Sequence, residues 1–265
     1  MRKNLFIWGL MASLYLSGTQ MANAEAVDKY WEPMQKAFFP NASIEESSAI
    51  KITAPIRAEN GAQVPFDFSI DYPMTEGQYI KAVSVIVDVN PVPLVAVYHF
   101  SPASGKAEIS TRIRIETDSY VHVVAETSDG KFLMNKVPIR AAGGCGGTIG
   151  GDESIARQSA GKMKLSIKPD STNQLKEARL LIKHPMYTGL QRDLVSQGFR
   201  PAFFINKVMA KFNGQVVFDA DTYIGVSEDP NIRFPFKADQ SGTLTVIVQD
   251  NEGKEFSTTA DVLVN

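Results

Sequence analysis

Short segments in which apolar and polar residues alternate recur along most of the chain from residue 50 onward. Val64, Phe66, Phe68 and Ile70, for example, would place their apolar side chains on one face of an extended segment. Alternation with a period of two is the pattern of a β-strand that buries one face. The pattern therefore predicts an all-β protein.

The predicted strands fall into two groups separated by a glycine-rich stretch. The first group is predicted at residues 50–54, 64–70, 82–89, 94–100, 108–116, 120–125 and 132–139. The second group is predicted at residues 163–168, 177–183, 203–212, 215–218, 232–236, 244–249 and 256–264. Turn-forming pairs such as Asn60-Gly61 and Asn213-Gly214 separate the strands. About seven short antiparallel strands per group are typical of an immunoglobulin-like sandwich, so two such domains are expected.

The first residues of the chain have the pattern of an export signal. Arg2 and Lys3 form a charged start, an apolar stretch follows, and residues 22–24 (Ala-Asn-Ala) form a small-residue cleavage site. We expect a mature protein that begins near Glu25 and is located in the periplasm. The apolar stretch is too short to span a bilayer, which needs about 20 residues, so no membrane insertion is expected.

These patterns give an organisation in four parts. Residues 1–24 are the predicted signal peptide, and residues 25–142 form the first sandwich, with a short helix over 27–39 that docks on it. Residues 143–162 form a glycine-rich arm and linker, and residues 163–265 form the second sandwich.

Charge excludes one large class of partners. The full chain has 27 basic and 29 acidic residues, and removal of the signal peptide takes away two basic residues, which leaves a net charge of about −4. Because nucleic-acid binding depends on a basic surface, nucleic acid is not an expected partner.

The arm carries the only cysteine of the chain. Six of the nine positions from 143 to 151 are glycine, a composition that predicts a mobile linker. Exported proteins usually pair their cysteines, yet Cys145 has no internal partner for a disulfide. In the run Gly143-Gly144-Cys145-Gly146-Gly147 the thiol has no bulky neighbour in sequence, which suits presentation to another protein's active site. Cys145 is therefore predicted to be functional and to reach solvent.

Other chemistries fit the glycine-rich run less well. Its spacing does not match a dinucleotide fingerprint or a phosphate-binding loop. A catalytic cysteine would need a base, and the three histidines, His99, His122 and His184, are all distant in sequence. A thiol on a flexible arm is also poorly pre-organised for catalysis. No catalytic residues are predicted.

Two further patterns were weighed against simpler interpretations. His184-Pro185-Met186 offers ligand types that copper accepts, but a turn with a structural hydrogen bond from His184 is favoured, and no metal site is predicted. Arg112 and Arg114 alternate with isoleucines on one strand, where they could steer an anionic cargo, although a solvated strand face is favoured.

Taken together, these residues resemble the sulfur-oxidation carrier family. The resemblance to SoxY rests on residues 58–61 (AENG), 64–65 (VP), 90–93 (NPVP), 111–114 (TRIR), 129–130 (DG) and the GGCGG run at 143–147. The resemblance to its partner SoxZ rests on residues 184–186 (HPM), Gly189, Asp193, 201–204 (PAFF), 212–214 (FNG) and 250–253 (DNEG). The sequence therefore resembles a SoxY module fused to a SoxZ module.

The resemblance implies a non-catalytic carrier whose Cys145 holds a sulfur-containing group covalently, with Gly143, Gly144, Gly146 and Gly147 as its arm. It implies no cofactor in the carrier itself and periplasmic oxidoreductases, such as a c-type cytochrome, as partners. In SoxY the GGCGG arm ends the chain, whereas here a second module follows. Fused carriers of this type are associated with quinoprotein (PQQ) alcohol dehydrogenases, so the resemblance implies a link to such a dehydrogenase system or to thiosulfate oxidation.

Two alternative hypotheses stay open at this point. The protein could be a binding or assembly module for a periplasmic dehydrogenase, in which Cys145 is incidental or forms a disulfide-linked dimer. It could instead be a thiol-dependent enzyme, if the fold brings a histidine next to Cys145.

Overall fold

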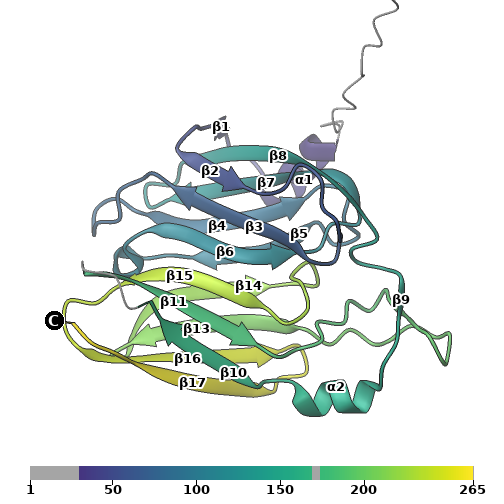
Figure 1. The fold of residues 1–265 in the computed structure, drawn as a ribbon. Helices are drawn as coiled ribbons and strands as arrows, with labels where there is room; N and C mark the ends of the chain where they lie inside the picture. The colour runs from purple at the N-terminus through teal and green to yellow at the C-terminus, as the bar shows by residue number, and fades with distance from the viewer. Residues whose placement is uncertain (1–29, 169–173, 265) are drawn as a thin grey trace, which may run out of the picture.

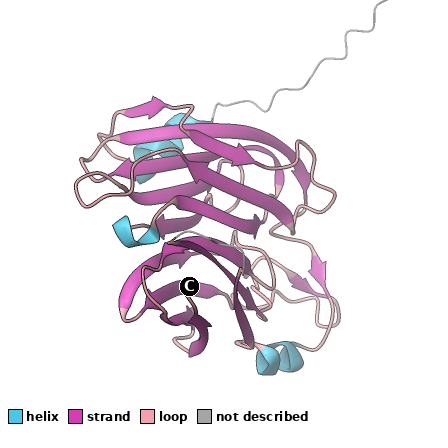
Figure 2. Cartoon of the chain, turned by 60° about the vertical axis from the view of Figure 1, so that its left-hand side comes forward, coloured by secondary structure: helices cyan, strands magenta, loops and turns pink. Residues whose placement is uncertain are grey.

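The computed structural model describes residues 30–168 and 174–264, so the predicted signal peptide and its cleavage site lie outside the described part. The prediction of an all-β fold is confirmed, because two packed sheets form the body of the protein (Figures 1 and 2). Two short helices in the described residues, α1 (Trp31–Phe38) and α2 (Glu153–Ser159), lie at its periphery. None of the described helices is long and apolar enough to cross a membrane.

The first half of the chain contributes strands to both sheets. These strands are β1 (Ile44–Glu46), β2 (Ile50–Thr53), β3 (Val64–Ile70), β4 (Ile80–Val87), β5 (Leu94–His99), β6 (Ala107–Ile113), β7 (Thr117–Thr127) and β8 (Phe132–Ala142). Strand β3 shows the predicted alternation, because its apolar residues are buried while Pro65, Asp67 and Ser69 lie nearer the surface. Strand β7 is different, because residues 121–125 are all buried.

The second half forms a similar arrangement. Its strands are β10 (Met163–Ile167), β11 (Leu175–Ile182), β13 (Ile205–Phe212), β14 (Gln215–Thr222), β15 (Asn231–Lys237), β16 (Gly242–Asp250) and β17 (Glu255–Val262). Two short strands, β9 (Thr148–Ile149) and β12 (Arg192–Asp193), pair in parallel outside the sandwiches. Most of the long strands match the predicted ranges, whereas β1, β9, β12 and α2 were not predicted.

The two halves share their sheets. The larger sheet has nine strands in the order β1-β8-β7-β4-β5-β14-β13-β16-β17, and the smaller has six in the order β10-β11-β15-β6-β3-β2. The halves meet where β5 pairs with β14 and where β15 meets β6, as the stacked upper and lower parts of Figure 1 show. The prediction that an arm joins two sandwiches is therefore incomplete, because backbone pairing joins them as well.

A single hydrophobic core follows the shared sheets across the boundary. Tyr98 of β5 stacks on Phe218 of β14 with ring centroids 6.2 Å apart, and Phe218 stacks on Phe234 of β15 at 4.5 Å. All three aromatic side chains are almost completely buried. Because burial of apolar surface is the main source of stability, the two halves should stabilise each other.

Helix α1 covers part of the outer face of the larger sheet, at the top of Figure 1. Trp31 stacks on the ring of His122 with centroids 4.0 Å apart, which explains why His122 on β7 is fully buried. His122 Nδ1 lies 2.9 Å from the Asp88 carboxylate. The helix lies within the predicted range 27–39, whose first residues are outside the described part.

The shared core predicts one cooperative unfolding transition for both halves. Phe218→Ala should destabilise the protein by about 3–5 kcal/mol, because it leaves a cavity at the boundary. In a protein that begins at Glu25, Trp31 is the only tryptophan and reports on the first half. Urea unfolding monitored by Trp31 fluorescence should therefore show the loss of stability, although the substitution lies in the second half.

Val216→Ala on the same strand is the matched control, because Val216 is 40% exposed and its truncation should cost much less. If Phe218→Ala left the Trp31 transition unchanged, the halves would unfold independently and the prediction would be wrong.

Candidate functional site

The segment that carries Cys145 lies on the boundary between the two halves. Strand β8 ends at Ala142, and the chain then crosses to β9 and α2 at one side of the molecule (Figure 1). Cys145 is only 1% exposed and is a free cysteine. The expectation of a mobile arm with an exposed thiol therefore differs from the structure, in which the segment is packed and the thiol is enclosed.

Close backbone packing explains two of the glycines in this region. A Cβ atom on Gly144 would lie 2.3 Å from the Gly61 carbonyl oxygen and 2.4 Å from that of Ile115. A Cβ atom on Gly61 would likewise lie 2.5 Å from the carbonyl oxygen of Ala142. Such distances are impossible for a side chain, so glycine lets three backbone segments meet here. The composition reflects tight packing at these positions as well as flexibility.

Glu116 binds the Cys145 segment from the first half. Its Oε2 atom accepts hydrogen bonds from the backbone N–H of Cys145 at 2.6 Å and of Gly146 at 3.1 Å. Its own backbone carbonyl accepts a further hydrogen bond from Gly143 N at 2.7 Å. One residue therefore satisfies three backbone donors of the arm.

Arg114, which directly follows β6, binds the same segment. Its guanidinium donates to the carbonyl oxygens of Gly144 at 3.0 Å and Met186 at 3.3 Å, and so touches both halves. The residue is only 2% exposed. The favoured prediction of a solvated face is therefore wrong for Arg114, because the second half covers this end of β6. Arg112, two residues earlier, donates to the Asp229 carbonyl and stays partly exposed.

The second half closes the site from the other side. Thr188 donates its hydroxyl hydrogen to the carbonyl of Cys145 at 2.7 Å in a buried position. Arg192 N donates to Gly147 O at 2.8 Å, and Leu194 N donates to Ile149 O at 2.9 Å. We call residues 187–200 the clasp, because they hold the arm by backbone pairing.

Buried polar contacts fix the clasp in place. Arg200 donates to the Asp193 carboxylate, to the hydroxyl of Tyr187 at 2.8 Å and to Gly151 O at 2.6 Å. Hydrogen bonds from the backbone N–H of Ser196, from Arg200 and from the backbone N–H of Val195 hold the pKa of Asp193 well below its usual range. The far end of the arm is thereby connected to the second half.

Helix α2 completes the connection, although residues 143–162 were expected to hold no packed element. Its N-cap, Asp152, accepts a hydrogen bond from Ser154 N at 2.7 Å. Arg157 forms ion pairs with Glu153 and Glu252 at 2.8 Å each and lies over the ring of Phe203. The helix is anchored to the second half by this arginine and by Ala156 and Ala160, which belong to a small apolar cluster with Tyr187 and Phe203.

The environment keeps the Cys145 thiol protonated. Burial is the main cause that raises its pKa to about 12, and the negative charge of Glu116 contributes in the same direction. The positive charge of Arg114 opposes this shift. Because the thiolate is the reactive form of cysteine, the enclosed thiol is chemically inert.

None of the three histidines is positioned as a partner of Cys145. His99 contacts Asp221 at 2.9 Å across the β5–β14 junction, and His122 contacts Asp88. His184 is buried, and its Nδ1 accepts a hydrogen bond from Met186 N at 3.2 Å. Burial lowers the pKa of His184 to about 4, so its ring is neutral at physiological pH.

The His184-Pro185-Met186 sequence lies in the loop after β11, where His184 makes the expected structural hydrogen bond. Within the described residues there is no group of three histidine, cysteine or acidic side chains that could hold a metal ion.

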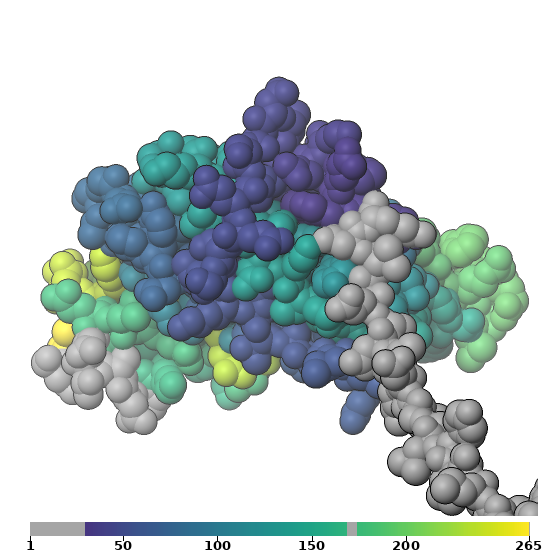
Figure 3. Space-filling model, turned by 90° about the horizontal axis from the view of Figure 1, so that it is seen from above, coloured from purple at the N-terminus to yellow at the C-terminus, as the bar shows by residue number. Residues whose placement is uncertain are grey.

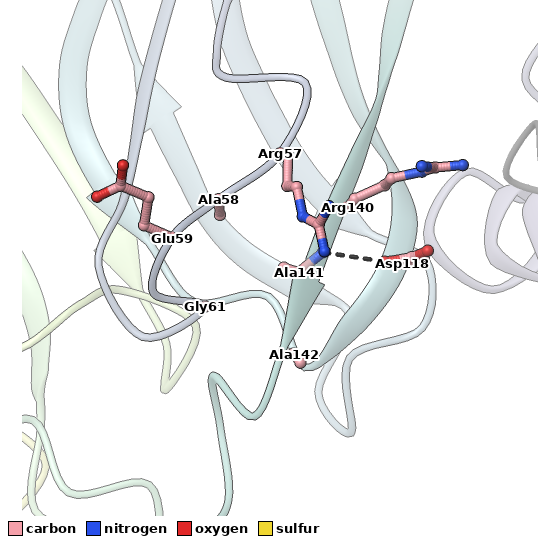
Figure 4. Close-up of a pocket in the computed structure, with 8 residues that line it drawn as sticks. All are labelled: Arg57, Ala58, Glu59, Gly61, Asp118, Arg140, Ala141 and Ala142. Carbon is pink, nitrogen blue, oxygen red and sulfur yellow. Dashed lines mark hydrogen bonds between the residues drawn. The ribbon is translucent and has the colours of Figure 1, made fainter. Parts of the chain in front are cut away.

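A polar cavity of about 320 Å³ opens next to the root of the arm (Figure 4). Arg57, Arg140 and Asp118 line it, together with Gly61 and Ala142 at the end nearest the arm. Asp118 accepts a hydrogen bond from Ala141 N at 3.0 Å. Cys145 does not line this cavity, so the cavity and the thiol are neighbours rather than parts of one pocket.

Fold and site define a tandem β-sandwich protein with one cysteine enclosed where its halves meet. Comparison with protein families agrees with this division, because residues 35–145 match the model of the sulfur oxidation protein SoxY and residues 163–261 match that of the sulphur oxidation protein SoxZ. The two matches together cover most of the chain. The protein is therefore a fused SoxYZ-type protein.

Solved structures show partial likenesses. The sulfur carrier protein SoxY from Chlorobium limicola f thiosulfatophilum is 28% identical, covers 43% of this chain and 92% of its own, and has a TM-score of 0.36. A superoxide reductase (neelaredoxin) from Ignicoccus hospitalis is 11% identical, covers 35% of this chain and 80% of its own, and has a TM-score of 0.33. No curated protein matches the chain. The family assignment rests on the two domain matches.

The enclosed thiol predicts slow alkylation of the folded protein. At pH 8, Cys145 in the native chain should react with iodoacetamide about a thousandfold more slowly than in urea, because a pKa near 12 leaves almost no thiolate. Intact mass measures the rate directly, since the chain has one cysteine. Similar rates in both states would show that the thiol is accessible.

Titration of Cys145 should also make stability depend on pH. Unfolding restores a pKa of about 8.5, so between this value and about 12 the unfolded state loses a proton that the folded state keeps. Relative to Cys145→Ala, the wild type should lose stability as pH rises through this window, by up to about 1.4 kcal/mol per pH unit. Urea unfolding of both proteins from pH 8 to pH 10.5 tests this, and parallel curves would contradict it.

Proposed function

We propose that the protein is a periplasmic, non-catalytic carrier that binds a sulfur-containing group covalently on Cys145 and presents it to partner oxidoreductases. One observation carries this proposal: the only cysteine of the chain lies at the last residue of the SoxY match and is enclosed by the SoxZ half through Thr188. Both halves of the family architecture therefore converge on one thiol.

The attachment of a sulfur-containing group to Cys145 fits a carrier that depends on its partners. Joining thiosulfate to the Cys145 thiol forms one S–S bond and releases one proton and two electrons. A partner, such as a c-type cytochrome or another periplasmic oxidoreductase, would take these electrons. The carrier supplies the Cys145 sulfur atom and controls when that atom is exposed.

The closed site implies that presentation requires opening. Cys145 must leave the contacts with Glu116, Arg114 and the clasp before a partner can reach its sulfur. Since β8 precedes the arm and α2 follows it, both ends stay attached when it opens. The thiol would be offered on a loop, which favours a partner with a shallow or slot-shaped site over one with a narrow tunnel.

A second candidate, an assembly module for a periplasmic dehydrogenase, is favoured by a different observation. Apolar side chains of the clasp point away from the protein, with Val195 92% exposed and Leu194 and Phe199 also exposed. Such residues are typical of an interaction surface. The clasp projects at the side of the molecule (Figure 3), where a partner could reach it.

The mass of the native protein distinguishes the two functions. The carrier predicts that protein purified from its own periplasm without reductant carries an adduct on Cys145 that dithiothreitol removes, with the mass of sulfur or a thiosulfonate. Cys145→Ser should retain the fold and abolish growth on the substrate that the partner oxidoreductase oxidises.

Val195→Ser in the clasp is the matched control, because it leaves the thiol intact. The assembly module predicts the opposite pattern, with a bare thiol, a functional Cys145→Ser variant and a defective Val195→Ser variant. That result would overturn the carrier proposal.

A further inference from the structure

We propose that Glu116 is a charge-sensitive latch, which holds the Cys145 segment closed while the side chain of Cys145 is neutral and releases it when Cys145 carries an anionic group. The inference deepens the proposed function, because oxidised sulfur groups such as thiosulfonates are anions. It adds a mechanism by which the Cys145 segment would be released in the carrier that bears an anionic group and closed in the carrier that bears none.

The arm itself forms an anion site. The N–H groups of Cys145 and Gly146 point at a single oxygen of Glu116, at 2.6 and 3.1 Å. Successive backbone N–H groups that converge in this way bind anions. A charged acceptor strengthens such hydrogen bonds, so the carboxylate holds the segment more firmly than a neutral group would.

The backbone of Glu116 is fixed beside the arm. Its N–H donates to Asn90 Oδ1 at 2.9 Å, and Asn90 Nδ2 donates to the carbonyl of Arg114 at 2.8 Å. Asn90 is buried. Because the backbone of Glu116 is fixed, its side chain stays within reach of the arm and of a new charge on Cys145.

The charge balance around Cys145 disfavours a second negative charge. The Cys145 sulfur belongs to the same residue whose N–H binds Glu116, and the carboxylate charge already acts on the thiol. A second negative charge at this position would repel the carboxylate within a poorly solvated site, where screening is weak. The closed arrangement is therefore compatible with a neutral side chain and opposed by an anionic one.

An independent observation points to an anion near Cys145. Arg114 is only 2% exposed, and its Nε has no hydrogen-bond partner among the described residues. Its positive charge attracts a negative charge on Cys145 and so opposes the repulsion by Glu116. Burial and Glu116 have the larger effects on the charge of Cys145, so the closed site as a whole disfavours an anion there.

Two adducts of nearly equal size test the latch. Cys145 is alkylated in urea with either iodoacetamide or iodoacetate, and the full chain is refolded, which gives a neutral and an anionic side chain of similar shape. Amide hydrogen exchange of the peptide that contains residues 143–151 is then measured by mass spectrometry. The anionic adduct should exchange at least about tenfold faster than the neutral one, because bulk is matched and only charge differs.

Two carboxylate-to-amide variants identify the residue responsible. Glu116→Gln keeps an acceptor for the two N–H groups but removes the charge, so the difference between the adducts should fall to within about twofold. Asp118→Asn, which alters the exposed carboxylate two residues away, should preserve the full difference.

Equal exchange of the two wild-type adducts would overturn the latch, and this comparison needs no variant to fold. A difference that persists in Glu116→Gln would overturn the role of Glu116. A charge effect in a protein whose native Cys145 bears no adduct would support the latch and refute the carrier. A native adduct without a charge effect would support the carrier and refute the latch.

Discussion

The pairing of β5 with β14 is the interaction on which the rest of the structure depends. It turns two sandwiches into one body with shared sheets and a continuous core. Once the halves are fixed side by side, the connection from β8 to β10 must run along their outer side, past the end of β6 and past the clasp. The position of Cys145 between Glu116 and Thr188 follows from this geometry.

The enclosed thiol changes how a carrier of this kind has to work. A free terminal arm offers its cargo by diffusing, whereas this arm is held by hydrogen bonds from both halves. Many contacts with modest individual energies keep it closed, and a buried acceptor or donor that loses its partner adds to the cost of opening. Protection of a reactive group and its exposure to a partner are therefore properties of one equilibrium.

The strands could be predicted from the sequence because alternation in β3 or β16 reports directly on one-sided burial. The pairing of the halves could not be predicted, because the pattern of one strand does not indicate which strand pairs with it in the sheet. Glycine was ambiguous for a physical reason: Gly144 permits close packing by the same lack of a Cβ atom that permits flexibility. The neighbours of Cys145 in sequence mark it as a candidate site residue, but Glu116 resembles any acidic residue at a strand end. Only the fold reveals its two hydrogen bonds to the arm.

The clasp belongs to the same chain as the cysteine it covers. In a complex of two separate subunits, dilution would remove such a cover, and exposure of the thiol would vary with protein concentration. Here the covalent linkage fixes the effective concentration of the clasp at the arm. Opening would therefore be a unimolecular event, and the fraction of exposed thiol would not depend on the concentration of the protein.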